Sequence, residues 1–231
     1  MLQISNLNQF YGESHTLWDL DIEIEPGKCT CLMGRNGVGK TTLLSCIMGL
    51  LQPASGNIKF EGVDLTRLSA ERRAPTGIGY VPQGRQIFPL LTVEENLQIG
   101  LPIRKDRSKQ IPDFIYELFP VLHDMRHRRG GDLSGGQQQQ LAIGRALVID
   151  PKLLILDEPT EGIQPNIVHE IGDIIRQLNR EIGLTVLLVE QKLPFVRRTS
   201  DHFIIMDRGR KVAAGDLDQL NDDLVQKYLT V

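Results

Sequence analysis

The sequence predicts an α/β fold with a mainly parallel sheet and an added antiparallel layer. Short apolar runs alternate with helical patterns along the chain, as in parallel-sheet proteins. Residues 153–156 form a continuous apolar run, which is typical of a strand covered on both faces. Residues 16–24 instead alternate apolar and polar side chains, which indicates a half-buried antiparallel strand. The 231 residues fit one large domain, and we expect a single domain over 1–231.

The N-terminal part of the chain, up to residue 81, is expected to contain three further strands and one helix. A Pro-Gly turn ends the alternating strand, and residues 29–33 are an apolar run that predicts a buried strand. A glycine-rich turn then leads into an apolar helix over residues 42–51. Two further short strands are expected at residues 58–60 and 78–81.

A helical subdomain is expected within the chain, over approximately residues 84–149. Thr92 and Glu95 have the spacing of a capping box, which predicts the start of a helix. From about residue 104, prolines, basic residues and helical spacing replace the strand pattern. Ser134 opens a further helix that runs to the end of this insert.

The C-terminal part returns to the strand and helix alternation. Residues 167–182 form an amphipathic helix, and residues 184–189 are a buried strand. Residues 203–206 and 211–213 flank an Arg-Gly pair and predict a hairpin. The tail over residues 217–229 is expected to be helical.

Composition narrows the class of protein. The net charge of −3 and the aromatic content of 5% disfavour a nucleic-acid binder, which needs basic excess and stacking surfaces. No apolar run reaches the length of a membrane span, and residues 1–4 do not resemble a secretion signal. We therefore expect any membrane role to come through a partner. Cys29 and Cys31 are expected to be core residues, with a metal site as the alternative.

A complete P-loop pattern, Gly-x-x-x-x-Gly-Lys-Thr, stands between the strand at residues 29–33 and the following helix. Its glycines let the backbone curl into a nest of N–H donors around phosphate, and the helix N-terminus adds a positive dipole end. Lys40 would neutralise the β- and γ-phosphates, and the Thr41 hydroxyl would bind Mg²⁺. The expected phosphate-binding residues are Gly34, Arg35, Asn36, Gly37, Val38, Gly39, Lys40, Thr41 and Thr42.

Two adjacent carboxylates follow the apolar run at residues 153–156. A carboxylate at the end of a strand near a P-loop is where a Mg²⁺ shell needs one. Asp157 would hold the metal, directly or through water. Glu158 would orient or deprotonate an attacking water.

The segment Leu133–Gln137, here called the signature segment, reads Leu-Ser-Gly-Gly-Gln. Ser134 with two glycines at a helix start makes a second anion nest, although an ordinary capped helix has the same pattern. One nucleotide does not need two nests from one chain. Two chains arranged head to tail would use both, because each nest would complete the other chain's site.

Taken together, the P-loop, Gln83, the signature segment and residues 153–158 resemble the ATP-binding subunit of an ABC transporter, over essentially the whole chain. The resemblance implies an ATPase with a P-loop ABC core, an antiparallel β layer and a helical subdomain. It implies that Tyr11 stacks on adenine, whereas the residues alone fit a core or turn position. It also implies that Gln83 touches Mg²⁺ and the attacking water. It implies that Ser134 and Gly136 bind the γ-phosphate held by the opposite chain. The residues of the signature segment implied to bind nucleotide are Ser134, Gly135, Gly136 and Gln137.

The resemblance also implies the surroundings of the chain. ATP and Mg²⁺ would be its cofactors, and transmembrane permease subunits its partners. A second ATP-binding subunit or a second copy would complete a dimer, and a periplasmic or extracellular substrate-binding protein would act indirectly. The chain would lie at the cytoplasmic face of the inner membrane, and nucleic acid is not expected. The basic cluster at residues 126–129 is expected to be a solvated face, with a membrane contact as the alternative.

Two departures from the usual family pattern point to a subgroup. Gln164 stands where the family usually has an aspartate at the interface between the two chains. Gln191 stands where the family usually has a histidine after the next strand, here called the switch position. Gln191 together with residues 161–165 is similar to importers of branched-chain amino acids and of urea, which pair two different ATPase subunits. The amino-acid sequences of residues 29–40 and 161–168 are most similar to those of the second ATPase subunit in the urea group. The expected function is therefore urea uptake, with branched-chain amino acids as the alternative.

Two other classes of protein remain as alternatives. A soluble ABC ATPase of DNA repair or translation usually carries two ATPase units or a long coiled-coil insertion, and 231 residues leave room for neither. A P-loop kinase or GTPase does not need the signature segment, and the guanine-reading Asn-Lys-x-Asp motif is absent from the sequence.

Because Gln191 can donate a hydrogen bond but cannot become charged, ATP hydrolysis should titrate little between pH 6 and 7. The variant Gln191→His should introduce a titration in this range, because the pKa of an ordinary imidazole is about 6.5. The measurement is the pH dependence of kcat for both proteins. An unchanged profile in the histidine variant would show that position 191 does not set the titration.

Overall fold

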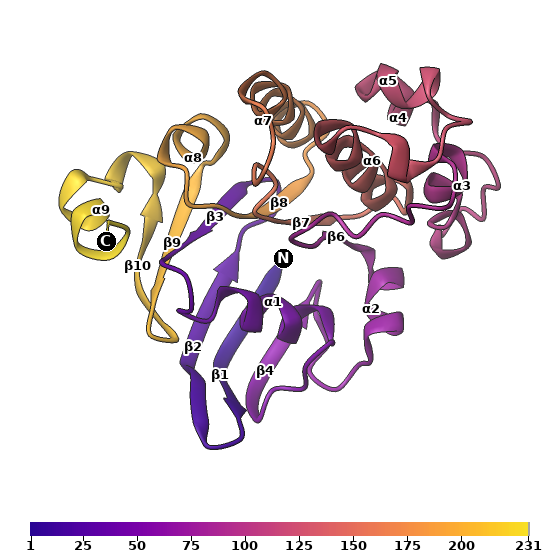
Figure 1. The fold of residues 1–231 in the computed structure, drawn as a ribbon. Coiled ribbons are helices and arrows are strands. Elements are labelled where there is room, and N and C mark those ends of the chain that lie inside the picture. The colour runs from indigo at the N-terminus through magenta and orange to yellow at the C-terminus, as the bar shows by residue number, and fades with distance from the viewer. Residues whose placement is uncertain (231) are drawn as a thin grey trace.

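The computed structural model describes residues 1–230, which form two sheets with helices packed around them (Figure 1). The larger sheet has six strands in the order β10-β9-β3-β8-β7-β6. Its strands are β3 (Cys29–Met33), β6 (Ile78–Val81), β7 (Leu153–Asp157), β8 (Thr185–Val189), β9 (His202–Asp207) and β10 (Arg210–Asp216).

Five of these six strands run parallel, and only β10 pairs antiparallel, in a hairpin with β9. The carboxyl ends of β3, β6, β7 and β8 therefore meet at one edge of the sheet. The predicted α/β fold with a mainly parallel sheet is confirmed. The expected hairpin near residues 203–213 is confirmed as well.

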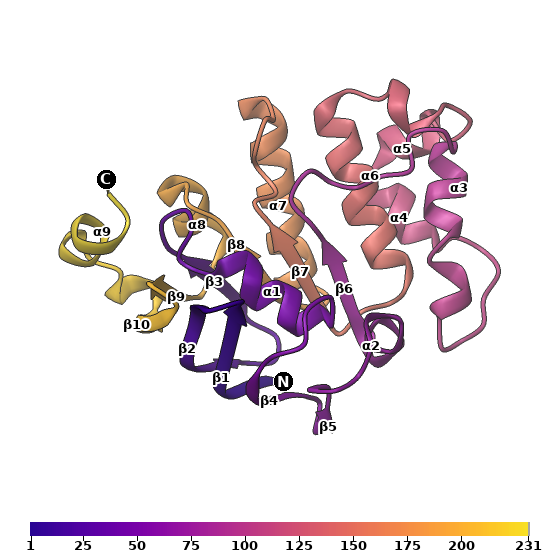
Figure 2. The same ribbon diagram turned by 60° about the horizontal axis from the view of Figure 1, so that its bottom comes forward.

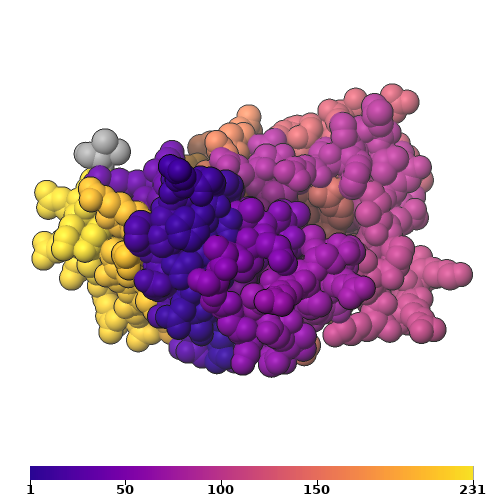
Figure 3. Space-filling view, turned by 90° about the horizontal axis from the view of Figure 1, so that it is seen from below, coloured from indigo at the N-terminus to yellow at the C-terminus, as the bar shows by residue number. Residues whose placement is uncertain are grey.

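The smaller sheet is antiparallel, with the order β2-β1-β4-β5. Its strands are β1 (Leu2–Tyr11), β2 (Ser14–Ile24), β4 (Ser55–Phe60) and β5 (Val63–Asp64). Seen from below, this N-terminal part lies between the C-terminal hairpin and the helices of the middle of the chain (Figure 3). The expected antiparallel layer is confirmed, and it is larger than the single strand that residues 16–24 predicted.

The helices cover both faces of the large sheet. Helix α1 lies between the two sheets, whereas α6, α7 and α8 lie on the opposite face, and α3 to α6 gather at one end (Figure 2). The α-helices are α1 (Lys40–Met48), α2 (Ala70–Gly77), α3 (Val93–Gln98), α4 (Asp113–Leu118), α5 (Pro120–Asp124), α6 (Gly135–Val148), α7 (Pro165–Arg180), α8 (Leu193–Thr199) and α9 (Asp222–Tyr228). Within residues 1–230, none of these helices has the length and apolar character needed to cross a bilayer.

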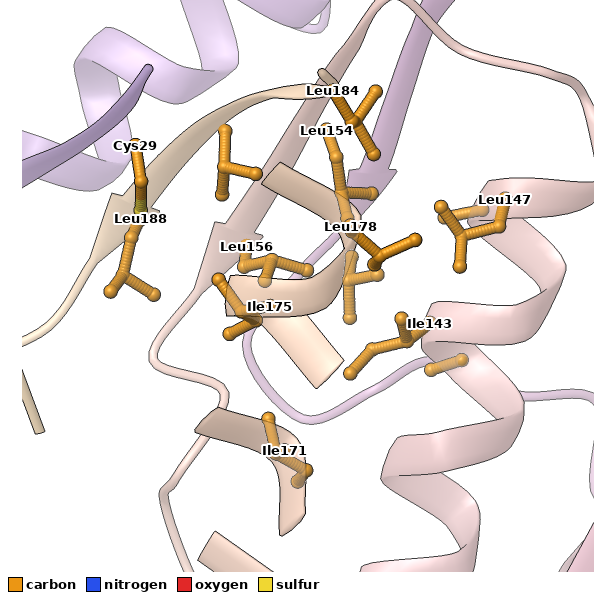
Figure 4. Packing of buried hydrophobic residues seen from close by; sticks show 14 of the residues in the cluster. Cys29, Ile143, Leu147, Leu154, Leu156, Ile171, Ile175, Leu178, Leu184 and Leu188 are labelled. Carbon is orange, nitrogen blue, oxygen red and sulfur yellow. The ribbon is translucent and has the colours of Figure 1, made fainter. Parts of the chain in front are cut away.

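Two hydrophobic clusters pack against opposite faces of the large sheet, as the alternation of side chains along a strand requires. On β7, Leu154 and Leu156 point into one cluster with α6 and α7, while Leu153 and Ile155 point into the other with α1. Figure 4 shows side chains of the first cluster, including Cys29 and Leu188. Cys29 and Cys31 are fully buried there, so their predicted core role is confirmed.

Local signals predicted several elements correctly. The capping box at Thr92 and Glu95 is present, and it starts α3. The tail is helical as expected, but it is divided in two: residues 217–219 form a short 3₁₀ turn, and α9 begins only after Asn221, whose side chain accepts a hydrogen bond from the backbone N–H of Leu224. The break in the helix accompanies the burial of the Leu220 side chain, which is only 4% exposed.

The C-terminal end of α1 is held by a buried arginine. Arg73 is fully buried, and its guanidinium donates to the carbonyl oxygens of Cys46 and Ile47 at 2.5 and 2.6 Å and of Leu68 at 2.9 Å. The last carbonyls of a helix have no partner within the helix, and a cation there also complements the helix dipole. Arg73 thereby fixes the helix whose other end carries the P-loop.

Candidate functional site

The P-loop follows β3 and leads into α1, where the sequence placed it. Gly37 and Gly39 have positive φ angles of 81° and 105°, which only glycine adopts without strain. At Gly34 a Cβ would lie 2.4 Å from the carbonyl oxygen of Met206, so no other residue fits. The loop therefore curls with its backbone accessible, as a phosphate nest requires.

Lys40 lies in this curl with only 6% of its surface exposed. Its ammonium group donates hydrogen bonds to the carbonyl oxygens of Gly34 at 2.6 Å and Arg35 at 3.0 Å. Burial lowers the pKa of Lys40, and the nearby carboxylates of Glu158 and Asp157 partly oppose this effect. The lysine is thus held over the loop, where an arriving phosphate would offer it a counter-charge.

A pocket of about 320 Å³ opens in front of the loop, here called the P-loop pocket. It brings together eight of the residues expected to bind nucleotide or to act on it, and adds Thr16 and Glu161, which the sequence had not singled out. The lining residues are Thr16, Asn36, Gly37, Gly39, Lys40, Thr41, Thr42, Gln83, Glu158 and Glu161. Tyr11 is not among them; it is 54% exposed at the end of β1, and its stacking on adenine stays a prediction.

Glu158 lies between two glutamine side chains that come from neighbouring strand ends. One carboxylate oxygen accepts the amide N–H of Gln191 at 2.8 Å, and the other accepts that of Gln83 at 3.2 Å. Gln191 also donates to the side-chain oxygen of Asn36 in the P-loop, at 2.8 Å. The backbone of Glu158 is left-handed, with a φ of 48°, and its N–H donates to the carbonyl oxygen of Val189. These contacts fix the direction of the Glu158 carboxylate.

Asp157 ends β7 and is 4% exposed. Burial, and then the neighbouring charge of Glu158, raise the pKa of the Asp157 carboxyl to about 6, while Lys40 partly lowers it. A buried carboxylate in such surroundings is stabilised by a cation. Thr41 and Gln83 line the P-loop pocket beside the residue that follows Asp157, Glu158, and hydroxyl, amide and carboxylate oxygens are donors of the kind that Mg²⁺ prefers. The donor set therefore fits Mg²⁺.

Sequence reasoning missed Glu161. Its carboxylate accepts the amide N–H of Gln83 at 2.9 Å, so Gln83 shares its amide between Glu158 and Glu161. The signal was present, because residue 161 follows the strand-end carboxylates by only three positions. The sequence does not show that the chain turns back at this point toward Gln83.

The signature segment lies at the start of α6. Ser134 caps the helix: its hydroxyl accepts the N–H of Gln137 at 3.3 Å, and the Gln137 side chain accepts the N–H of Ser134 at 2.9 Å. A Cβ at Gly136 would lie 2.8 Å from the Ile167 side chain, which explains that glycine. This segment borders a second pocket of about 380 Å³ that Gln164 also lines. The two pockets share no lining residue, so they are separate on the chain.

The fold and the P-loop pocket define a P-loop ATPase. Comparisons with known proteins support this class. The family model of the ABC transporter matches residues 17–161. The chain is 43% identical over 213 residues to the high-affinity branched-chain amino acid transport ATP-binding protein BraG of Pseudomonas aeruginosa, covering 92% of this chain and 91% of the relative. It is 38% identical to the probable branched-chain amino acid transport ATP-binding protein LivF of Archaeoglobus fulgidus, covering 95% and 94% of the two chains.

Among solved structures, a dimeric ATP-binding cassette in a post-hydrolysis state with ADP and Pi matches with a TM-score of 0.83 and 25% identity, covering 94% of this chain and 99% of that one. The chain belongs to the ABC transporter family. It is the ATP-binding subunit of such a transporter, and it hydrolyses ATP. Subunits of this type act as dimers with transmembrane permease partners.

Replacing Asp157 with Asn should stabilise the nucleotide-free chain at neutral pH. The folded chain keeps the Asp157 proton up to about pH 6, whereas an unfolded aspartate loses it near pH 4. The contribution of this proton to stability is full below pH 4 and is lost as the pH rises through 6, so the wild type carries a buried charge at pH 7. We expect the Asn variant to have a free energy of unfolding about 1–3 kcal/mol higher at pH 7, and a smaller advantage at pH 5.

The measurement is urea unfolding in EDTA without nucleotide, at pH 5, 6 and 7. Asp173→Asn is the matched control, because Arg198 lowers the pKa of that exposed carboxyl and its loss should not stabilise the chain. An advantage of the Asp157 variant that is equal at all three pH values would show that the buried charge of Asp157 is not its cause.

Proposed function

We propose that the chain powers an importer of the branched-chain amino acid group. The observation that carries this is the 43% identity to BraG over nearly the full length of both chains. Together with its dimer partner and the permease, the chain would lie peripherally at the cytoplasmic face of the membrane. A substrate-binding protein on the opposite side would deliver the solute, as the import direction requires.

The geometry of the P-loop pocket supports a specific division of roles. The backbone from Gly34 to Thr42 and the ammonium of Lys40 hold the triphosphate, and Tyr11 stacks on the adenine. Glu158 accepts a proton from the attacking water as the oxygen of that water bonds to the γ-phosphorus and the bond to the ADP oxygen breaks. Gln83 and Gln191 hold the two oxygens of Glu158, so that the base keeps one orientation.

Mg²⁺ would be held by Thr41, Gln83 and Asp157, and would neutralise charge on the phosphates during hydrolysis. Bound metal would lower the pKa of Asp157, because the cation would stabilise the ionised carboxylate against the cost of its burial. The buried position of Asp157 restricts the motion of its carboxylate, and the ammonium of Lys40, held over the P-loop, would supply a positive charge to the phosphates.

The two separate pockets on one chain, the P-loop pocket and the pocket at the signature segment, support a head-to-tail dimer. Ser134, Gly135, Gly136 and Gln137 would contact the triphosphate bound by the partner chain's P-loop, so closure would need ATP in place. Residues 84–149, which hold α3 to α6 and no strand, would form the helical subdomain that transmits closure to the permease. ATP binding closes the dimer, and hydrolysis lets it reopen.

A second candidate substrate is urea. Its support is the amino-acid sequence of residues 29–40 and 161–168, which is similar to the sequences of the urea branch of this group. These residues lie in the ATPase and do not touch the solute, so only transport measurements separate urea from branched-chain amino acids.

The substrate test is uptake of labelled urea and labelled leucine in cells whose only copy carries Lys40→Ala. Loss of leucine uptake alone supports the branched-chain amino acid importer, and loss of urea uptake alone supports the urea branch with the same mechanism. The control is a strain with the wild-type copy at equal expression. Survival of both uptakes would exclude both substrates.

The variant Glu158→Gln should keep ATP binding, trap the closed dimer and lower kcat by about 10²–10³-fold, as loss of a general base does. Size-exclusion chromatography with Mg-ATP and an ATPase assay measure both effects. Glu161→Gln is the matched control: it removes a charge from the same pocket but leaves both amides on Glu158 in place, so kcat should fall less than tenfold. Open monomers in ATP together with persistent hydrolysis would exclude the role of Glu158 as the base.

A further inference from the structure

Glu190 is a buried carboxylate that the roles assigned above do not use. It follows β8 directly, is 3% exposed, and precedes Gln191 in the chain. No basic side chain forms an ion pair with it among residues 1–230. A buried charge of this kind is costly unless hydrogen bonds satisfy it.

Three donors satisfy the Glu190 carboxylate. One oxygen accepts the backbone N–H groups of Gln191 at 2.8 Å and Lys192 at 3.1 Å. The other accepts the hydroxyl of Thr160 at 2.5 Å, and Thr160 is fully buried. Lys192 closes the arrangement, because its ammonium donates to the carbonyl oxygen of Thr160 at 2.9 Å. Hydrogen bonds to an ionised acceptor are stronger than neutral ones, so these contacts hold their geometry well.

The carboxylate joins two loops that both reach the P-loop pocket. Thr160 belongs to the turn that carries Glu158, and Gln191 belongs to the turn after the neighbouring strand. The two turns meet again at the surface of the pocket, where the Gln191 amide donates to Glu158 at 2.8 Å. Glu190 therefore lies beneath this contact and fixes the backbone on both sides of it.

We propose that Glu190 is a positioning residue for ATP hydrolysis. It holds the backbone of Gln191 and the turn that carries Glu158 in fixed relative positions, so that the Gln191 amide keeps its hydrogen bond to the Glu158 carboxylate. The proposal rests on the proposed roles of Glu158 and Gln191. The Gln191 side chain is exposed and long, so its contact with Glu158 depends on a fixed backbone. Glu190 fixes this backbone, because its carboxylate accepts the N–H of Gln191 itself and that of the next residue, Lys192.

The test is a mutant cycle on the full chain, with kcat and KM for ATP as the readouts. Glu190→Ala should lower kcat by at least tenfold and change KM by less than threefold. Glu190→Gln should recover kcat to within about threefold of the wild type, because an amide oxygen can accept both N–H groups while its NH₂ donates to Thr160. In a Gln191→Ala background, Glu190→Ala should lower kcat by less than threefold, because the side chain that it positions is gone.

Controls separate positioning from folding. Thr160→Val removes one donor without touching the carboxylate, and it should lower kcat three- to tenfold in the wild type but not in the Gln191→Ala background. Glu181→Ala, at an exposed site after α7, should leave kcat unchanged. If Glu190→Ala fails to fold, Thr160→Val and Thr160→Ser carry the same cycle, with Ser restoring the rate.

The outcomes distinguish the positioning role of Glu190 from the proposed function. A Gln191→Ala variant with the wild-type kcat would overturn the role of Gln191 and the positioning role together. A slow Gln191→Ala variant whose defect multiplies with that of Glu190→Ala would overturn the positioning role alone and leave the proposed function in place. The proposal is supported if the kcat defects of Glu190→Ala and Gln191→Ala do not multiply in the double variant and if Glu190→Gln recovers kcat.

Discussion

The parallel alignment of four strands is the constraint on which the site depends. Because β3, β6, β7 and β8 run in one direction, their carboxyl ends meet at one edge of the sheet. The P-loop, Gln83, the pair Asp157 and Glu158, and Gln191 each follow one of these ends. The order β3-β8-β7-β6 places β7 between the strands that precede the two glutamines, and this is why both amides reach Glu158 from opposite sides. Reversing or shifting one strand would move its residue away from the pocket.

The packing of the sheet makes this edge rigid. Each strand of the parallel core buries both faces, one against α1 and the antiparallel sheet and the other against α6 and α7. The loops at the edge are short and begin from fixed positions. A carboxylate such as Asp157 can then be held almost without exposure, although burial raises its pKa. Local strain at Glu158, a non-glycine residue with a positive φ, is tolerated for the same reason, because the strand before it fixes where the backbone enters the turn.

Much of this arrangement could be predicted from the sequence, because the signals are local. The P-loop pattern, the buried strand that ends at Asp157 and the serine cap at Ser134 each need fewer than ten consecutive residues. Contacts between distant segments could not be predicted in this way. Glu161 reaches Gln83 across 78 positions, and Glu190 reaches Thr160 across 30, so only the fold reveals them. The break in the helical tail could not be predicted either, since helical spacing alone does not show that Leu220 must turn inward to be buried.

A glutamine at the switch position changes what the site can regulate. A histidine at position 191 would donate or lose a proton near neutral pH, so its contact with phosphate or base would vary with conditions. The amide of Gln191 always donates, and in this structure it divides its two N–H groups between Glu158 and Asn36 of the P-loop. The link between base and P-loop is therefore constant in charge and depends only on backbone position. Under the proposed mechanism, control of hydrolysis in such a site comes from geometry, through the partner chain's signature segment and the buried contacts of Glu190.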